Sequence, residues 1–494
     1  MSDVERIALG TARGRWVLAA TALGSGMAFL DGTVVNVALP AMGEDFHANV
    51  AGLQWIVNGY MLMLASLILL SGSLGDKFGR RKTFVIGVIW FAVASVICAF
   101  APNLEVMIAG RVLQGIGGAL LTPGSLAILQ TTFQHSDRGK AVGAWSGLTS
   151  VAAAVGPFVG GSLVDSGYWQ AIFLLNVPLA LATIVVTLRH VPETRDETAP
   201  ARLDYTGAAL ATVGLAGLTY GLIRAGDSGF TDPGVVGSLL IGVISLAVFV
   251  EVERRSSHPM LPPGIFKNIR FTGANLVTIA VYGALGTATF LVVVYLQTGL
   301  GYDAIWAGAS LLPMTLLMLF LSGYAGGLSD RIGPQLPMTV GPLLMAGGFL
   351  LMLRIGPGSN YFVDVLPGVV VLGLGLVATV APLTATVLSS VEDHHAGIAS
   401  GVNNAIARSA QLMAVAAIPL AAGITGDVYL DPGAFHDGFG KALWISAALA
   451  AAGGAVAWFT LGDRTKQRAK APVLVHHHRH CALEAPPYAD SREP

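Results

Sequence analysis

The sequence predicts an all-α membrane protein with fourteen transmembrane helices, arranged as two parallel six-helix bundles with two inserted helices. Three observations support this prediction: charged residues are scarce, apolar runs recur fourteen times, and basic residues alternate between the two sides of these runs. Of the 494 residues, 54% are hydrophobic and only 12% are charged, whereas a soluble domain carries about a quarter charged residues. The mean hydropathy of +0.67 also indicates a bilayer as the solvent.

Each apolar run is long enough to cross a membrane, since a helix needs about 20 apolar residues to span the hydrocarbon layer. Backbone N–H and C=O groups in lipid must bond within their own segment, so we expect helices. The runs lie at 16–40, 54–74, 83–101, 104–130, 140–164, 168–189, 205–223, 234–252, 271–297, 304–325, 337–356, 361–388, 400–424 and 440–461.

The basic residues predict the orientation of the chain. If the side of the N-terminus is called inside, the inside segments hold 23 of the 28 Lys and Arg residues. The outside loops hold only Arg224, Arg354 and Lys441. Because cytoplasmic loops are enriched in Lys and Arg, we expect an even number of spans in the inner (plasma) membrane, with both termini cytoplasmic. The first run is long enough to span, so we expect it to be retained rather than cleaved as a signal.

An internal repeat divides the chain. The segment Gly72–Gly79 recurs as Gly326–Gly333, and both copies follow an even-numbered run on the inside. Repeats in the same orientation indicate parallel halves. The copies lie 254 residues apart, and six helices need only about 180 residues, so two helices are inserted between the halves. The predicted parts are a cytoplasmic tail (1–15), a first bundle (16–190), the inserted helices and linkers (191–269), a second bundle (270–461) and a cytoplasmic tail that we expect to be disordered (462–494).

Two ionisable residues lie deep inside apolar runs, where a charge is costly and indicates function. Asp31 precedes Pro40 by nine residues and Arg111 follows Leu104 by seven, which puts them about 13 and 10 Å below the outer ends of their helices. At these depths they could meet. The pair is either a structural ion pair or a proton site, because burial favours the protonated form of a carboxyl group and a neighbouring cation favours the ionised form. Asp31 and Arg111 are our candidates for proton coupling.

The first copy of the repeat is a candidate conformational latch. Its key residues are Gly72, Asp76, Gly79, Arg80 and Arg81. The positive charge alone is expected of any inside loop, whereas the repeated spacing of Gly and Asp is more specific. Glycines allow tight turns, and Asp76 could face the N-terminus of a helix in the other half, where the helix dipole favours an anion. Such a contact would hold the inside closed.

The fifth run contains small residues at a spacing of four. Ala152, Gly156 and Gly160 follow this spacing, and Pro157 and Gly161 adjoin it. Small residues at this spacing let helices approach closely, and proline bends a helix. Helix packing alone would also explain the pattern.

Further residues are candidates for lining a substrate cavity. They are polar, aromatic or methionine side chains inside apolar runs: Asn36, Tyr60, Gln114, Phe290, Tyr295, Met314, Asn404 and Arg408. Arg408 belongs to a polar stripe with Asn403, Asn404 and Gln411 on the thirteenth run, which either lines a cavity or bonds to neighbouring helices. Ordinary packing would explain the aromatic and methionine residues as well.

Other chemistries find little support in the sequence. The chain has no Gly-x-x-x-x-Gly-Lys-Ser/Thr loop for nucleotide phosphates, so we expect no nucleotide partner, and we expect no nucleic acid or cofactor either. The tail 476–481 is rich in His, but we read it as disordered rather than as a metal site. The expected partners are a small-molecule substrate, protons and the lipid bilayer, and we expect a monomer.

Several of these motifs together resemble the major facilitator superfamily. The resemblance rests on the 72–82 loop, the segment around Arg111 (110–118) and the Gly156-Pro157 helix. The segments 30–40, 55–60 and 169–178 are similar to the fourteen-helix drug:proton antiporter branch. The resemblance covers residues 15–461 and implies two bundles that rock about a central cavity, with Asp31 in proton coupling and Gly156 and Pro157 in antiport.

The resemblance implies a proton-coupled exporter of small amphipathic drugs or secondary metabolites. Ala152 replaces the usual first glycine of the fifth-helix motif, and the thirteenth run lacks the acid found in some multidrug members, which argues against strongly cationic substrates. In the family that the sequence resembles, members that export lipids have a long outside loop between the ninth and tenth helices. Here this loop spans only 298–303, which argues against lipid as the substrate. The alternatives are an uptake symporter of the same fold, which the Gly156-Pro157 motif disfavours, and a membrane enzyme or channel.

Overall fold

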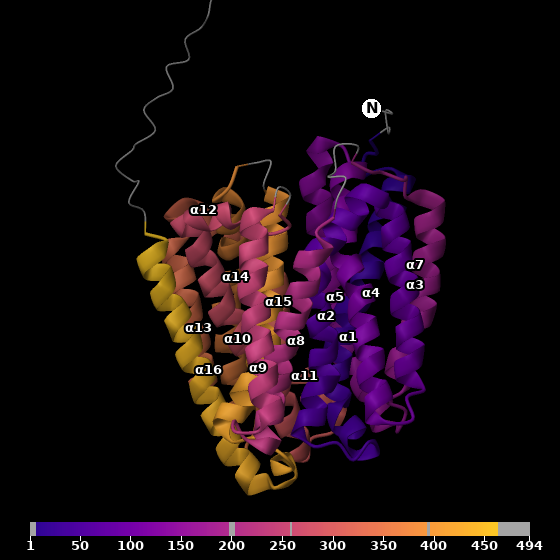
Figure 1. Ribbon diagram of the computed structural model, residues 1–494. Helices are drawn as coiled ribbons and strands as arrows, with labels where there is room; N and C mark the ends of the chain where they lie inside the picture. The colour runs from indigo at the N-terminus through magenta and orange to yellow at the C-terminus, as the bar shows by residue number, and fades with distance from the viewer. Residues whose placement is uncertain (1–5, 197–202, 257–258, 393–395, 463–494) are drawn as a thin grey trace, which may run out of the picture.

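Within the described residues of the computed structural model, fourteen helices are long and apolar enough to cross a membrane, as the sequence predicts. The structure describes residues 6–196, 203–256, 259–392 and 396–462, and within these ranges it is helical, with no β-strand. Both ends of the described chain lie on one side of the molecule (Figure 1). We call this the terminal side and the other the opposite side.

The first half consists of seven helices, the sixth and seventh of which together make one span. They are α1 (Ala12–Asp45), α2 (Val50–Phe78), α3 (Arg80–Ala99), α4 (Leu104–Thr132), α5 (His135–Asp165), α6 (Ala171–Leu174) and α7 (Asn176–His190). Side chains cap several of these helices: Thr11, Asn49 and Asn103 each accept a hydrogen bond from a backbone N–H in the first turn.

The second half has the same succession of six spans, and its second and fourth spans are interrupted. Its elements are α10 (Ile269–Thr298), α11 (Ala304–Ala309), α12 (Leu312–Ile332), α13 (Gln335–Met352), the π-helical turn η2 (Tyr361–Val365), α14 (Leu366–Ser389), α15 (Ala396–Ala422), the 3₁₀ turn η4 (Val428–Leu430) and α16 (Pro432–Thr460). The halves also pack alike, because α1 contacts α5 and α7 as α10 contacts α15 and α16, and α4 contacts α2 and α3 as α14 contacts α12 and α13.

The inserted helices α8 (Tyr205–Ser228) and α9 (Pro233–Arg255) form a hairpin, followed by the 3₁₀ turn η1 (Pro263–Lys267). The hairpin lies in front of the boundary between the halves in Figure 1, where α8 contacts α2 and α15. Glycines 214, 217 and 242 let α8 and α9 approach closely, since a Cβ at Gly217 would lie 2.9 Å from the backbone N of Gly242.

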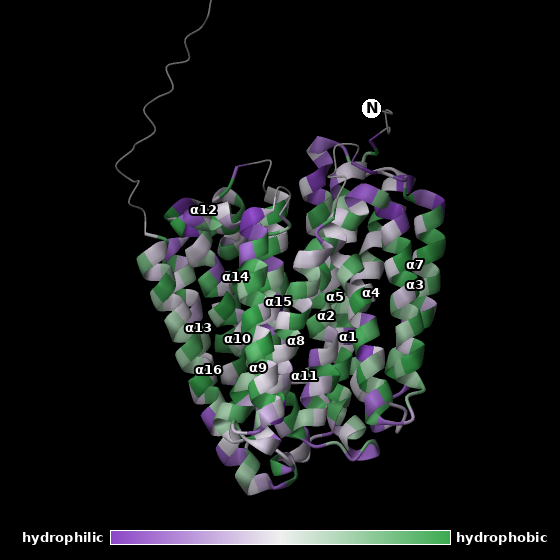
Figure 2. Ribbon diagram, in the orientation of Figure 1, coloured by the Kyte–Doolittle hydropathy of each residue, from purple (hydrophilic) through white to green (hydrophobic). Residues whose placement is uncertain are grey.

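The surface is apolar along the length of the spans and polar at both ends (Figure 2). Large hydrophobic side chains such as Trp90 on α3 and Ile241 and Ile244 on α9 are exposed in the middle of their helices. Exposed apolar residues in this number fit a hydrocarbon solvent. The sequence placed the spans correctly but their ends less well: Arg224 and Lys441, expected in loops, lie inside α8 and α16, because helices extend past the apolar layer into the polar interface.

Candidate functional site: a buried ion pair beside a cavity

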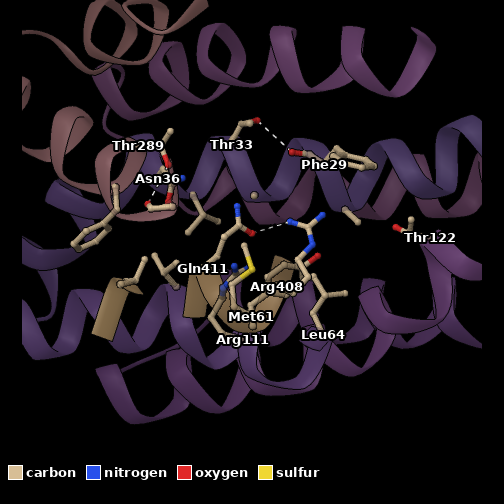
Figure 3. Close-up of a pocket in the computed structure, with 18 of the residues that line it drawn as sticks. Phe29, Thr33, Asn36, Met61, Leu64, Arg111, Thr122, Thr289, Arg408 and Gln411 are labelled. Carbon is tan, nitrogen blue, oxygen red and sulfur yellow. Dashed lines mark hydrogen bonds between the residues drawn. The ribbon is translucent and has the colours of Figure 1, made fainter. Parts of the chain in front are cut away.

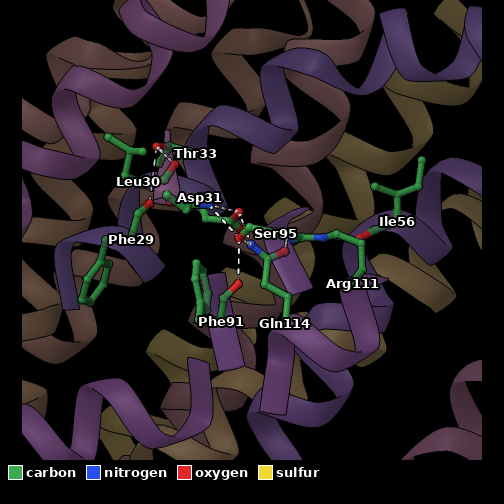
Figure 4. A network of polar contacts seen from close by, with 10 residues as sticks. Phe29, Leu30, Asp31, Thr33, Ile56, Phe91, Ser95, Arg111 and Gln114 are labelled. Carbon is green, nitrogen blue, oxygen red and sulfur yellow. Dashed lines mark hydrogen bonds and ion pairs between the residues drawn. The ribbon is translucent and has the colours of Figure 1, made fainter. Parts of the chain in front are cut away.

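Asp31 on α1 and Arg111 on α4 form an ion pair inside the first half (Figure 4). Nη1 of Arg111 donates to Oδ2 of Asp31 at 2.6 Å, and each side chain is 2% exposed. Nε of Arg111 donates to the main-chain oxygen of Ile56 on α2 at 3.0 Å. The two residues that the sequence placed at similar depths therefore meet.

A set of buried polar side chains completes this site. Nε2 of Gln114 donates to Oδ1 of Asp31 at 2.8 Å and to Oγ of Ser95 at 2.9 Å, and its Oε1 accepts a hydrogen bond from Arg111. Nδ2 of Asn176 donates to Oγ of Ser95 at 3.1 Å and lies 3.5 Å from Oδ1 of Asp31. Helices α1, α3, α4 and α7 thus converge around one carboxylate. The sequence analysis missed Ser95 and included Asn176 only in the segment 169–178 that resembles the antiporter branch, not as a site residue.

Aromatic rings cover the guanidinium of Arg111. Its Cζ lies 4.6 Å from the ring centre of Tyr60 and 5.9 Å from that of Phe173. A cation over an aromatic face is stabilised by about 0.5–2 kcal/mol. Removing one member of a buried ion pair costs about 3–5 kcal/mol, because the other charge is left without a partner. We therefore expect a change in the charge of Asp31 to destabilise the packing of α1 against α4.

A cavity of about 190 Å³ lies beside the ion pair and between the two halves (Figure 3). Arg111 forms part of its wall, so the pair borders the cavity. The lining comes from α1, α2 and α4 of the first half and from α10 and α15 of the second. Its polar or charged residues are Thr33, Asn36, Tyr60, Arg111, Thr122, Thr289, Asn404, Arg408 and Gln411, and its larger apolar residues are Phe29, Val35, Val57, Met61, Leu64, Ile68, Phe290 and Val415.

Five of the eight candidate cavity residues line this cavity and three do not. Those that line it are Asn36, Tyr60, Phe290, Asn404 and Arg408. Gln114 instead belongs to the Asp31 network. Tyr295 is buried against α16, where its ring stacks on Phe439 at 4.3 Å and its hydroxyl bonds to His436. Met314 lies against α14, since a Cβ at Gly373 would be 2.9 Å from its Cα.

The polar stripe of α15 serves both purposes that the sequence left open. Asn404, Arg408 and Gln411 line the cavity. Asn403 instead donates to Oδ1 of Asn275 at 3.0 Å and to Oγ1 of Thr278 at 2.7 Å, both on α10. One face of α15 therefore meets the cavity and the adjacent face bonds to its neighbour.

Hydrogen bonds close the molecule on the opposite side. Asp165 at the end of α5 accepts from the backbone N–H groups of Ala304 at 2.8 Å and Ile305 at 3.1 Å. The hydroxyl of Tyr429 donates to the carbonyl of Ala48 at 2.6 Å. Further bonds join Gln297 to the carbonyl of Val37 and Gln54 to that of Val415. The cavity lies on the terminal side of these bonds and extends that way to Ile68, Thr122 and the exposed Asn404.

The small residues of α5 lie where α5 meets α1 and the second half. A Cβ at Gly156 would overlap Oγ1 of Thr33, and one at Gly160 would lie 2.8 Å from Cγ1 of Val34. A Cβ at Gly161 would overlap the backbone of Ile305, and one at Gly308 would lie 2.9 Å from Cβ of Pro157. The motif thus borders the contact that closes the opposite side.

The candidate latch residues lie at the terminal side and bond to one another and to the linker that follows α7. Nη2 of Arg80 donates to Oδ1 of Asp76 at 2.6 Å. Glu193, which follows α7, accepts from the backbone N–H groups of Arg81 and Lys82 at 3.0 and 3.1 Å. Gly79 has a φ of +106°, a conformation that favours glycine. A Cβ at Gly72 would meet nothing within 4 Å, so close packing does not require this glycine here.

Metal chemistry finds no support in the described ranges. They contain no group of three or more His, Cys, Asp or Glu side chains that could hold an ion. The His-rich segment 476–481 lies outside the described residues.

Two matching bundles of spanning helices around a shared cavity define the architecture of a secondary membrane transporter. A sequence model of the Major Facilitator Superfamily matches residues 21–416. The chain belongs to this superfamily, which confirms the family prediction made from the sequence. As a member it is a multi-pass membrane transporter rather than an enzyme.

Its relatives support the fourteen-helix drug:proton antiporter branch. The chain is 36% identical to the "Tetracenomycin C resistance and export protein" of Streptomyces glaucescens, over 85% of this chain and 78% of the relative. It is 33% identical to the "Multidrug efflux pump LfrA" of Mycolicibacterium smegmatis, over 78% of this chain and 77% of the relative. A solved structure of a peptide transporter POT in complex with sulfate matches 93% of this chain and 99% of that one, with a TM-score of 0.68 at 14% identity, which concerns the fold alone.

Proposed function

We propose that this protein is a proton-coupled antiporter that exports small amphipathic drugs or secondary metabolites by alternating access. The observation that carries the proposal is the Asp31–Arg111 pair, a buried carboxylate and its counter-ion at the wall of a cavity between two halves. The names of the relatives, a resistance and export protein and a multidrug efflux pump, support export as the direction and drug-like molecules as the substrates.

Asp31 is the proposed carrier of the transported proton. Asp31 does not line the cavity itself, but it bonds to Arg111, which does. Among the described residues, no other carboxylate bonds to a residue of the cavity lining. Protonation removes its negative charge and leaves Arg111 with only Gln114, the Ile56 carbonyl and two rings as partners. Because an unpaired buried charge is costly, protonation favours a rearrangement of α1 against α4. This change links the proton to the movement of the halves.

The proposed location is the inner (plasma) membrane, with both termini in the cytoplasm. The excess of Lys and Arg on the terminal side supports this orientation. The cavity then extends towards the cytoplasm while the opposite, outer side is closed. This conformation would receive substrate from the cytoplasm, as an exporter must.

We also propose that Asp76 acts as a latch in the alternative conformation, in which the terminal side is closed. Asp76 ends α2 on the terminal side, and α15 of the second half begins on the same side. When the terminal side closes, the carboxylate could approach the N-terminus of α15, where an anion is worth about 0.3–1 kcal/mol. Asp76 would exchange its bond to Arg80 for this contact.

The experiment uses Asp31→Asn in inverted membrane vesicles with an imposed pH gradient. We expect the variant to fold and bind substrate but to lose gradient-driven substrate accumulation, because the amide cannot take up a proton at neutral pH. Glu105→Gln, at an exposed acid outside the cavity on the opposite side, is the control and should accumulate substrate like the wild type. Full gradient-driven accumulation by Asp31→Asn would refute the role of Asp31.

A further inference from the structure

The cavity carries an unbalanced positive charge on its second-half wall. Two charged residues, Arg111 and Arg408, are among those that line it, and the described lining includes no carboxylate. Arg111 is neutralised by Asp31 at 2.6 Å. Among the residues that the structure describes, Arg408 has no such partner: its Nη1 donates to the neutral Oε1 of Gln411 at a long 3.3 Å. The close-up shows both side chains among those that line the cavity (Figure 3).

The donors of Arg408 are available to a ligand. A guanidinium has five N–H donors in a planar fork and no acceptor. One of them bonds to Gln411, and the side chain is half-buried at the cavity wall. Its neighbours in the lining include Gln411 one turn later and Asn404 one turn earlier on α15. The rest of the wall is mainly apolar and aromatic, with Phe29, Met61 and Phe290 contributing.

We propose that Arg408 is the specificity-determining residue of the cavity, and that it selects uncharged amphipathic molecules with oxygen acceptors at one end and rejects cations. This inference rests on the proposed export function and names its substrate class. The ligand would place carbonyl, hydroxyl or ether oxygens against Arg408 and Gln411 and its apolar body against the aromatic wall.

The charge balance explains both the preference and the exclusion. A cationic ligand would meet the charge of the half-buried Arg408 beside an apolar wall, where like charges repel more strongly than in bulk water. An anionic ligand would be attracted by Arg408. Protonation of Asp31 would leave the positive charge of Arg111 uncompensated, and the anionic ligand would then bind more tightly. Substrate and proton would then bind together, contrary to exchange. An uncharged ligand with oxygen acceptors uses the donors of Arg408 without this conflict.

The test is equilibrium binding to the full-length protein in lipid nanodiscs, with binding to empty nanodiscs subtracted. The two probes share one three-ring skeleton: acridone, which is neutral and has a carbonyl oxygen, and 9-aminoacridine, which is a cation at neutral pH. We expect the wild type to bind acridone at least 10-fold more tightly. Because a hydrogen bond to a charged group corresponds to about 10- to 100-fold in affinity, Arg408→Gln should weaken acridone binding by about this factor.

Two further variants distinguish a change of specificity from a loss of folding, because only a folded protein can show the binding expected of them. Arg408→Lys keeps the charge and should still reject 9-aminoacridine, whereas Arg408→Glu should bind 9-aminoacridine more tightly than the wild type does. Arg354→Gln, at an exposed arginine outside the cavity, is the matched control and should bind both probes like the wild type.

The inference is wrong if the wild type binds 9-aminoacridine as tightly as acridone, if it binds neither probe, or if Arg408→Gln retains the preference. No pH gradient is present in this assay, so its outcome is separate from the coupling of Asp31. A preference for acridone without any gradient-driven transport would instead contradict the proposed function.

Discussion

Asp165 offers a quantitative test of how the opposite side closes. Its two carboxylate oxygens accept backbone hydrogen bonds from Ala304 and Ile305, at 2.8 and 3.1 Å, and so join the end of α5 to α11 in the other half. A hydrogen bond to a charged group contributes about 1.5–3 kcal/mol when shielded. Asp165 is exposed, so we take about 1–2 kcal/mol for both bonds together. Asp165→Ala should therefore shift the balance between the two conformations about 5- to 30-fold towards opening of this side.

The assay is the distance between spin labels on Glu105 of α4 and Asp437 of α16, which are exposed residues on the opposite side of the two halves. In Asp165→Ala the population at longer distances should grow, whereas Asp303→Ala should leave the distribution unchanged, since the Asp303 side chain makes no capping bond to α11. An unchanged distribution in Asp165→Ala would refute the assignment of these bonds to closure.

Three further predictions follow from packing, orientation and the latch. Gly156→Leu should lower transport and thermal stability because the new side chain overlaps α1, whereas Gly147→Leu on the same helix, where a Cβ meets nothing within 4 Å, should have little effect; similar losses in both would contradict the packing argument. Single cysteines at Asp303 and Glu392 should be labelled from outside and from the cytoplasm, respectively, by a membrane-impermeant reagent in intact cells and inverted vesicles, and the reverse pattern would overturn the orientation. Asp76→Asn should lengthen the distance between spin labels at the terminal ends of α2 and α15 and slow transport, and an unchanged distance would leave Asp76 without a role as a latch.

The sequence predicted the parts of the fold that depend on hydrophobicity and charge. The sequence has fourteen apolar runs, and the described residues form fourteen helices long enough to span a membrane. The number could be predicted because the thickness of the bilayer fixes the length of a spanning helix. The meeting of Asp31 and Arg111 could be predicted because both are ionisable, rare inside a membrane and at similar depths. The breaks between α6 and α7 and between α11 and α12 could not, because they depend on tertiary packing and leave the local apolar pattern unchanged.

The lining of the cavity was predicted less completely because it depends on helix rotation. At 100° per residue, Tyr295 lies about 140° around α10 from Phe290, so both cannot face the cavity. Gly286, Thr289 and Phe290 form the face that does, and Gln297, two turns after Phe290, points the same way and bonds to Val37. A small or polar stripe at helical spacing was the signal that could have identified this face.

Two polar residues of the Asp31 network were not identified as site residues for a different reason. Ser95 and Asn176 are single polar residues in apolar runs, and such residues also bond within their own helix. Ser95 does so as well, since its hydroxyl donates to the carbonyl of Phe91 at 2.8 Å. Only the packing of α3 and α7 against α1 and α4 brings Asn176 to 3.5 Å from the carboxylate and Ser95 into contact with Gln114 and Asn176.

An antiporter moves substrate and protons in opposite directions across the membrane. The most direct measurement is the internal pH of sealed proteoliposomes, reported by a trapped pH-sensitive dye, when a substrate gradient is imposed without a pH gradient. Substrate entering the vesicles should drive protons out and raise the internal pH, and Asp31→Asn should abolish this change. Acidification of the interior as substrate enters would identify a symporter, and substrate transport without any pH change in the wild type would contradict proton coupling.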